Sequence, residues 1–362
     1  MYIPAAPSLS PLALVRALYL QAAPPPREDR VYASYGRYCL RMLADAAARL
    51  GVKELLAPAY ICREALEPVM AGPLRVRFYD VRPDLAPDLE KLAPAPSGSA
   101  ALLLVHYFGF PNAVEEVTGF CREKDFRLIE DCAQALFSMD NGKPLGSFGD
   151  AAFFSPRKFL PIPHGAYTVI NHPELKKALL QPSGDAPSPG PTLGRDLARW
   201  VLFQSGTNLG LGDGDDHLLP EARPWRRLDV PPAISGLARQ MLSRQEQDRE
   251  SVIIRRRRNY EQLSQELAPL PLKPLFPDLP TGVCPLAFPV IPPNRDEVLQ
   301  RLRRAGIGAQ FWPALPDEVF NNPHFPEANR LRRQLLLLPV HQDLSSRHLA
   351  HLSCSLAKAL QP

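Results

Sequence analysis

The 362-residue sequence contains no apolar run close to the roughly 20 residues that a helix needs to span a bilayer. No basic cluster precedes the short, proline-broken apolar pieces of residues 1–26, so a secretory signal is not expected either. The six cysteines include no CxxC pair, which argues against a zinc knuckle and against a disulfide framework. We therefore expect a cytoplasmic protein with no membrane partner and no bound metal, in which most cysteines are buried as small apolar side chains.

The sequence also has little net charge for its length, a formal +4, far from that of a typical nucleic-acid-binding protein. We expect no nucleic-acid partner, although a local basic rim would suit a phosphorylated substrate. The four arginines at residues 255–258 fit either a solvated helix face or a nucleic-acid patch. Their neighbours, from Ile234 to Leu267, mix apolar and charged residues at helical spacing, which favours the solvated face.

With 45% hydrophobic and 22% charged residues, the composition is that of a globular protein, and the length suggests two domains or one large α/β unit. In the first two thirds, strand-like and helix-like segments alternate. This alternation predicts a mainly parallel sheet covered on both faces, with ligands at the carboxyl ends of its strands. The expected strands are residues 54–57, 75–80, 100–105, 127–130 and 151–155, and the expected helices are residues 38–50, 65–71 and 114–124.

We expect a large domain at residues 1–230, and a long helix with a small α+β C-terminal domain at residues 231–362. Residues 182–232 are rich in Gly, Pro and Asp, and predict a partly irregular connection that covers the active site or a partner subunit. The long helix is expected at about residues 232–267. The small domain is expected to contain a strand at residues 284–291, a helix at residues 295–305 and a final helix after Asp343.

The segment from Phe126 to Ile170 carries the strongest functional pattern. Asp131 closes one expected strand and Lys158 lies just beyond the next, so both side chains should reach the same crevice of a parallel sheet. A pyridoxal-phosphate (PLP) enzyme needs a carboxylate against its pyridine nitrogen and a lysine that forms an imine with the aldehyde. Desolvation and the nearby cationic ring lower the pKa of such a lysine, which suits it to act as nucleophile and proton shuttle.

At these residues the sequence resembles the DegT/DnrJ/StrS family of PLP-dependent sugar aminotransferases. The resemblance covers most of the chain and implies the aspartate-aminotransferase fold, type I: a mainly parallel, seven-stranded sheet in a large PLP-binding domain, plus a smaller α+β domain. It also implies a transaminase that moves an amino group from an amino-acid donor such as glutamate to a keto or aldehyde acceptor, often a keto sugar or sugar nucleotide. The matching segments are residues 129–135 (IEDCAQA), 142–150 (GKPLGSFGD), 154–158 (FSPRK), 105–109 (VHYFG), 58–60 (PAY) and 338–341 (LPVH).

Carried over residue by residue, the resemblance implies that Asp131 pairs with the pyridine nitrogen, that Gln134 contacts the ring hydroxyl side, and that Lys158 forms the Schiff base. Ser155 and the turn Tyr35-Gly36-Arg37-Tyr38, at a helix N-terminus, would bind the cofactor phosphate. Arg37 is otherwise a solvated arginine at the start of a helix. His106 lies near the ring or makes a structural hydrogen bond, and Tyr60 and Cys62 are expected to pack in the core.

Two departures from the family pattern concern the substrate side. Residues 161–166 (PIPHGA) replace a Gly-rich stretch, so a stiffer loop should follow Lys158. The Asn-Tyr-Arg-like element with which a neighbouring subunit often touches the phosphate has only weak counterparts, at Asn208 and residues 225–227. The alternatives to a transaminase are a dehydratase of the same family, which typically has a histidine in place of the lysine, and a catalytically silent relative that binds a ligand or partner. The resemblance further implies a homodimer whose active sites lie at the interface.

Overall fold

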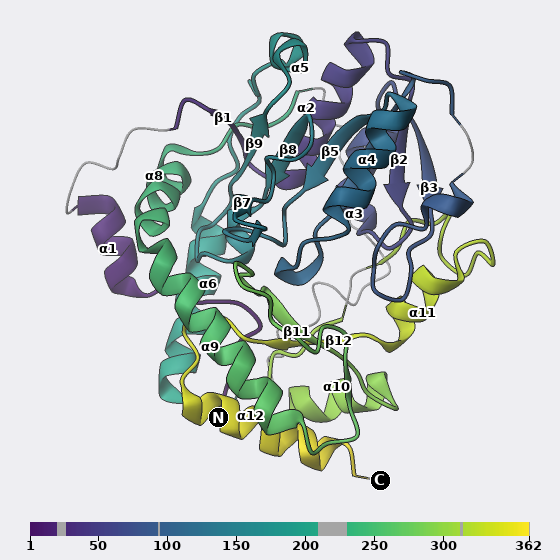
Figure 1. Ribbon diagram of the computed structural model, residues 1–362. Coiled ribbons are helices and arrows are strands. Elements are labelled where there is room, and N and C mark those ends of the chain that lie inside the picture. The colour runs from purple at the N-terminus through teal and green to yellow at the C-terminus, as the bar shows by residue number, and fades with distance from the viewer. Residues whose placement is uncertain (20–26, 93–94, 209–229, 312–313, 362) are drawn as a thin grey trace.

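The computed structural model describes residues 1–19, 27–92, 95–208, 230–311 and 314–361. Its main feature is a seven-stranded sheet in the order β1-β9-β8-β5-β4-β2-β3 (Figure 1). The neighbours β3, β2, β4, β5 and β8 run parallel, whereas β9 is antiparallel to both β8 and β1. The mainly parallel sheet expected from the sequence is therefore confirmed. Its strands are Arg30–Ala33 (β1), Glu54–Pro58 (β2), Arg75–Tyr79 (β3), Ala100–Val105 (β4), Arg127–Asp131 (β5), Ala151–Phe154 (β8) and Ala166–Ile170 (β9).

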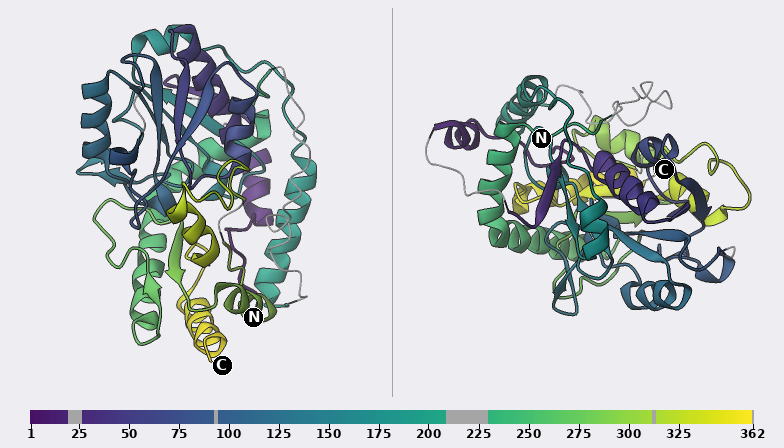
Figure 2. Two further views of the ribbon diagram at one scale, coloured as in Figure 1. Left: turned by 90° about the vertical axis from the view of Figure 1, so that its right-hand side faces the viewer. Right: turned by 90° about the horizontal axis from the view of Figure 1, so that it is seen from above.

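The central strands are apolar because helices cover both faces of the sheet (Figures 1 and 2). In β4, which reads AALLLV, all six residues are buried. Helix α2 (Gly36–Arg49) packs against β1, β8 and β9, and α4 (Val114–Lys124) packs against β5. Helix α3 (Arg63–Met70) packs against α2 and β3. With both faces covered, the edge at which the parallel strands end becomes the place for a ligand.

A second, antiparallel sheet lies below the first in the view of Figure 1 and has the order β10-β11-β12. The helices α9, α10 and α12 pack around it. The N-terminus joins this lower part, since the N–H of Ile3 donates to Gly306 and the N–H of Gly308 donates to Ile3. The expected domain boundary at residues 230 and 231 stays a prediction. The elements are Lys273–Pro274 (β10), Ala287–Ile291 (β11), Leu336–Pro339 (β12), Arg249–Leu267 (α9), Arg295–Arg304 (α10), Pro326–Gln334 (α11) and Ser346–Ala359 (α12).

The connection expected at residues 182–232 contains a helix that the sequence pattern did not predict. Helix α6 spans Gly190–Ser205, and residues 209–229 lie outside the described part of the chain. Only Asp196 and Phe203 of this helix are buried, so it has a thin apolar stripe and a weak periodic signal. Outside the two large sheets lie the helices Pro11–Tyr19 (α1) and Pro173–Ala178 (α5) and the short strands Met139–Asp140 (β6) and Lys143–Pro144 (β7). The 3-10 turns are Leu89–Lys91 (η1), Tyr107–Gly109 (η2), Pro156–Lys158 (η3) and Glu246–Asp248 (η4).

The expected long helix at residues 232–267 is broken into two. Helix α8 spans Gly236–Gln245 and α9 spans Arg249–Leu267, with the 3-10 turn η4 (Glu246–Asp248) between them. Glu246 in this turn forms an ion pair with Arg30 at 2.8 Å, which ties the break to β1. A tertiary ion pair of this kind leaves no trace in the spacing of apolar residues.

The arginine run at residues 255–258 is not a uniformly solvated face. Arg255 and Arg258 are exposed as expected, but the prediction is wrong for Arg256, which is fully buried, and Arg257 is half-buried. Arg257 donates to the carbonyls of Pro280 and Val283 at 2.8 and 2.9 Å. The run therefore contributes hydrogen bonds to backbone carbonyls of the lower part of the molecule. In the described part of the chain, no helix has the length and apolar character to cross a membrane.

Candidate active site

The candidate site lies where three adjacent parallel strands end. In the register of the sheet, Val105 of β4 is opposite Asp131 of β5, and Asp131 is opposite Phe153 of β8. The chain leaves these strands at His106, at Asp131 itself and at Ser155, and the turn η3 (Pro156–Lys158) then carries Lys158. The structure thus places the residues that follow these strand ends along one edge, as the sequence predicted.

The charges of Asp131 and Lys158 influence each other's pKa. Asp131 is buried, and its Oδ1 accepts the N–H of Ala133 at 2.9 Å. Burial raises the pKa of Asp131, and the charge of Lys158 opposes this rise. Burial lowers the pKa of Lys158, and Asp131 opposes that change in turn. The side chain of Lys158 forms no hydrogen bond or ion pair within the described residues, so its amine is available to an incoming group.

The N-terminus of α2 lies against Ser155 and provides a place for an anion. A side-chain carbon added to Gly36 would lie 3.7 Å from the Cβ of Ser155, so the two residues are in close contact. Tyr35, the residue before the helix, makes no side-chain hydrogen bond to the helix start. The hydroxyl of Ser155, which is buried, has no hydrogen-bond partner within the described residues. Uncapped N–H groups beside an unpartnered hydroxyl suit a phosphate.

The side chains of this turn are less free than the sequence suggested. Arg37 lies 3.3 Å from the carboxylate of Glu64, and its Nε is buried without a hydrogen bond. The N–H of Tyr38 already donates to the carbonyl of Tyr35 at 3.0 Å, so only the side chain of Tyr38 remains for a ligand. Burial raises the pKa of this phenol, which therefore stays protonated.

Arg157 is a residue that the motif reading missed. Its guanidinium lies 5.6 Å from the centre of the Tyr35 ring, and that of Arg37 lies 5.2 Å from the same ring. Arg157 forms no hydrogen bond or ion pair within the described residues. Its position next to Lys158 was the available sequence signal. Two cations around Tyr35 make this end of the site strongly favourable for a phosphate.

Gln134 and His106 are held by the protein itself. The Oε1 of Gln134 accepts the N–H of Phe108 at 3.2 Å, and both groups are buried. The Nδ1 of His106 accepts the N–H of Asn112 at 3.2 Å, while Nε2 lies 3.0 Å from Glu130 and donates to it. The ring of His106 therefore has only its face left for a cofactor. Of the two roles expected for His106, the structural hydrogen bond is present.

Glu130 gives a structural reason for the GSFGD segment (residues 146–150), which the sequence analysis used only to recognise the family resemblance. Its carboxylate accepts the N–H groups of Gly146, Phe148 and Gly149 at 2.7 to 2.8 Å, in addition to the bond from His106. Burial alone would raise the pKa of Glu130, but the hydrogen bonds from His106 and the backbone lower it. The segment is thus a loop folded around a buried carboxylate.

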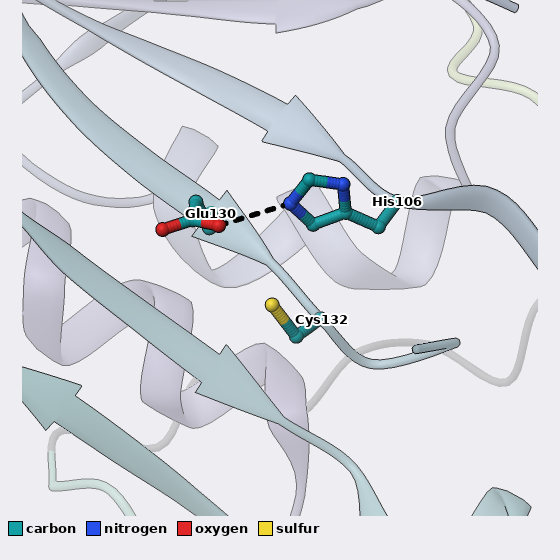
Figure 3. A group of neighbouring side chains, drawn as sticks. All are labelled: His106, Glu130 and Cys132. Atoms are coloured by element: carbon teal, nitrogen blue, oxygen red, sulfur yellow. Dashed lines mark hydrogen bonds and ion pairs between the residues drawn. The ribbon is translucent and has the colours of Figure 1, made fainter. Parts of the chain in front are cut away.

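The group His106, Glu130 and Cys132 could at first be taken for a metal site, since one potential ligand atom from each lies within 4.8 Å of the others (Figure 3). However, both ring nitrogens of His106 are engaged and the carboxylate of Glu130 accepts four hydrogen bonds. Burial raises the pKa of the Cys132 thiol in the metal-free protein. The geometry is that of a hydrogen-bonded structural cluster.

The surroundings of Lys158 are tightly packed. In the segment after it, Ile162, Pro163 and His164 are buried, and Gly165 adopts a φ of 143°, which favours glycine. Tyr60, expected in the core, is fully buried with its ring 5.7 Å from that of Tyr107. Cys62 is half-buried and lies within the electrostatic reach of Lys158.

Taken together, the seven-stranded sheet, the buried carboxylate at a strand end and the lysine side chain without a partner in the described residues form the arrangement that a PLP-dependent enzyme of fold type I requires. Residues 43–184 match the model of the DegT/DnrJ/EryC1/StrS aminotransferase family. This match agrees with the resemblance that the sequence motifs predicted, and the residues around Asp131 and Lys158 are of the kinds that pyridoxal 5'-phosphate requires.

Two kinds of relatives extend this result. The dTDP-4-dehydro-2,3,6-trideoxy-D-glucose 4-aminotransferase of Saccharopolyspora spinosa is 28% identical over 323 residues, which cover 85% of this chain and 78% of the relative. The crystal structure of the aminotransferase TlmJ from Streptoalloteichus hindustanus has the same fold, with a TM-score of 0.73, 24% identity and 99% coverage of both chains. Spr1654 from Streptococcus pneumoniae, a putative sugar aminotransferase solved in its PLP form, gives a TM-score of 0.68 at 14% identity, with 99% of both chains covered.

Proposed function

We propose that this aminotransferase moves an amino group from an amino-acid donor, with glutamate as the first choice, to the keto or aldehyde group of a sugar, either free or nucleotide-linked. The observation that supports it best is that buried Asp131 and Lys158 follow neighbouring strands of one sheet, within electrostatic reach of each other, and that the Lys158 amine has no hydrogen-bond or ion-pair partner in the described residues. The printed name of the Saccharopolyspora relative supports a dTDP-linked keto sugar as the first acceptor to test.

Pyridoxal phosphate supplies an aldehyde that captures amines and a ring that accepts electrons from the bond being broken. In our proposal, the carboxylate of Asp131 holds a proton on the ring nitrogen and so keeps the ring electron-poor. Lys158 would hold the aldehyde when the cofactor is bound, and its Nζ would take up and return the proton of the donor's α-carbon. A lowered lysine pKa suits this role, because the amine must be neutral when it takes up the proton.

The remaining assigned residues orient the cofactor. Gly36 and Ser155 would bind the phosphate through N–H and O–H groups, with Arg37 and Arg157 supplying positive charge. The side chain of Tyr38 would border the phosphate side. Gln134 would face the ring hydroxyl, and His106 would support the site through its hydrogen bonds to Glu130 and Asn112 rather than touch the ring.

Lys158 also favours transamination over the two alternatives. A dehydratase of this family typically carries a histidine at this place, and a silent relative would have no use for a reactive lysine. Spectroscopy distinguishes the cases: the purified protein should be yellow and should lose that colour when the amino donor is added. A colourless protein, or one whose colour no donor changes, would contradict a transaminase.

We further propose a homodimer with active sites at the interface. Its support is the resemblance to this family, together with apolar side chains that are exposed on α1 and α6. Light scattering on dilution into the nanomolar range tests this; a stable, yellow and active monomer would exclude it. The cytoplasmic location stays a prediction. The exposed side chains are Leu12 and Val15 of α1 and Val201 of α6, at 57%, 44% and 56%.

A further inference from the structure

Arg256 is a buried cation without a carboxylate partner in the described residues. It lies on α9, is fully buried, and burial lowers its pKa to about 10, so it remains charged at neutral pH. Its guanidinium donates only to neutral acceptors. These are the Oε1 of Gln342 at 2.9 Å and the carbonyls of Pro285, Leu286 and Phe159 at 3.1, 3.2 and 3.2 Å.

One of these acceptors belongs to the residue that follows Lys158. The carbonyl of Phe159 accepts a second hydrogen bond from the Nε2 of Gln342 at 2.9 Å. The guanidinium carbon of Arg256 also lies 4.7 Å from the centre of the Phe159 ring. Both the backbone and the side chain of Phe159 are thus held from the same side, by α9 and by the segment after β12.

We propose that Arg256 is a positioning residue for Lys158. It joins the carbonyl of Phe159 to the two residues just before β11 and to Gln342, and so fixes the backbone from which the Lys158 side chain extends. A guanidinium suits this role because its five donors lie in one rigid plane and reach acceptors from three segments at once. A neutral side chain of the same length cannot do so, and a lysine has a single point of donation.

The same helix offers a matched control. Arg257 also donates to backbone carbonyls, those of Pro280 and Val283, but it makes no contact with the lysine segment. If the arginines of α9 only stabilised the lower part of the molecule, removing either one would affect stability and leave the chemistry of Lys158 alone. A specific role of Arg256 predicts that the two variants differ in chemistry.

The test compares Arg256→Met, Arg256→Lys and Arg257→Met in the PLP-loaded full chain, following the donor half-reaction by loss of the visible band. It rests on the proposed function, which the wild-type protein tests first: no colour change with any donor means that the function, not the inference, has failed. In Arg256→Met we expect the limiting rate to fall about 10- to 100-fold, with the half-saturating donor concentration changed less than about threefold, because Arg256 touches no substrate.

The comparison has further expected outcomes. Arg256→Lys should recover part of the rate, and Arg257→Met should react within about twofold of the wild-type protein. The pH at which the visible absorbance band is half-changed should shift in Arg256→Met and stay the same in Arg257→Met, since only Arg256 helps to fix the backbone next to Lys158. Equal rates and equal midpoints in the two methionine variants would overturn the proposal.

If Arg256→Met does not fold, Gln342→Leu provides the decisive variant. It removes the other donor to the Phe159 carbonyl and the acceptor of the Arg256 Nε. We expect its limiting rate to fall about 3- to 10-fold at an unchanged half-saturating concentration. A Gln342→Leu protein that reacts as fast as the wild type would show that the Phe159 carbonyl needs no fixation, and the proposal would be wrong.

Discussion

Glu130 and Asp131 are adjacent buried carboxylates at the end of one strand, yet their surroundings differ. Since successive side chains of a strand point to opposite faces, Glu130 shares its side of the sheet with His106 and Cys132, whereas Asp131 points to the other. Glu130 accepts four hydrogen bonds and its pKa is lowered; Asp131 accepts one and its pKa is raised. A carboxylate whose acceptor sites are filled by its own protein supports structure, and one left short of partners is available for a ligand.

The cationic side chains differ in the same way, in how many partners the protein already provides for them. Arg37 is paired with Glu64 and Arg256 with four neutral acceptors, whereas Lys158 has no partner in the described residues. The number of bonds that a charged group already makes is therefore the measure by which we rank the expected effects of substitution.

The largest effect is expected for the group with no partner. Lys158→Ala should lower the rate of the donor half-reaction by at least about 10³-fold, because both the anchoring amine and the proton carrier are lost. Stopped-flow absorbance measures the rate. In the wild-type protein, borohydride should fix the cofactor covalently at Lys158; peptide mapping that finds the label on another residue would contradict the assignment.

Asp131→Asn should slow the half-reaction about 10²-fold or more, since an amide cannot hold a proton on the ring nitrogen. Its effect on the fold has the opposite sign. The folded-state pKa of Asp131 is raised, so its ionisation costs stability once the pH exceeds the folded-state value. The cofactor-free variant should therefore be as stable as the wild type at acidic pH and more stable at neutral pH. Near wild-type turnover would remove Asp131 from the mechanism.

Glu130→Gln should reverse this pattern, with a loss of folding stability of about 1–3 kcal/mol and a smaller effect on the half-reaction than Asp131→Asn. The folded-state pKa of Glu130 is lowered, so its contribution is present above the unfolded-state pKa and disappears as the pH falls through the folded-state value. Urea unfolding of the cofactor-free proteins at several pH values checks this. The same acid dependence in the wild type and in the Glu130→Gln variant would contradict the contrast between the two carboxylates.

The smallest effect is expected at the paired arginine. Arg37→Ala should weaken cofactor binding by about 3- to 10-fold, because part of its charge is already compensated by Glu64. Arg157→Ala, which removes a cation without a partner in the described residues, should weaken it more. Titration of the cofactor-free proteins with pyridoxal phosphate compares the two; a stronger loss in Arg37→Ala would reverse the ranking.

Most of the large sheet was predictable, because its parallel strands are short apolar runs bounded by polar turns and each lies within a residue or two of its expected position. The antiparallel strands β1 and β9, at the sheet edge, were missed, as were α11 and β12. Helix α6 was missed because it buries only two residues. The break between α8 and α9 was missed because it coincides with an ion pair between Glu246 and the distant Arg30, which the spacing of apolar residues does not reveal.

The sequence alone provided the family resemblance, the cofactor that this resemblance implies and the two residues that we assign to the chemistry, because these two residues lie at or shortly beyond strand ends within one contiguous segment. It did not distinguish Glu130 from Asp131 in role, or Arg256 from the three arginines beside it. These distinctions depend on which polar groups from distant segments, such as Gly146, Gln342 and Phe159, occupy the available bonds. In a buried, low-dielectric environment each such bond has a large effect, and only the tertiary structure specifies which groups meet.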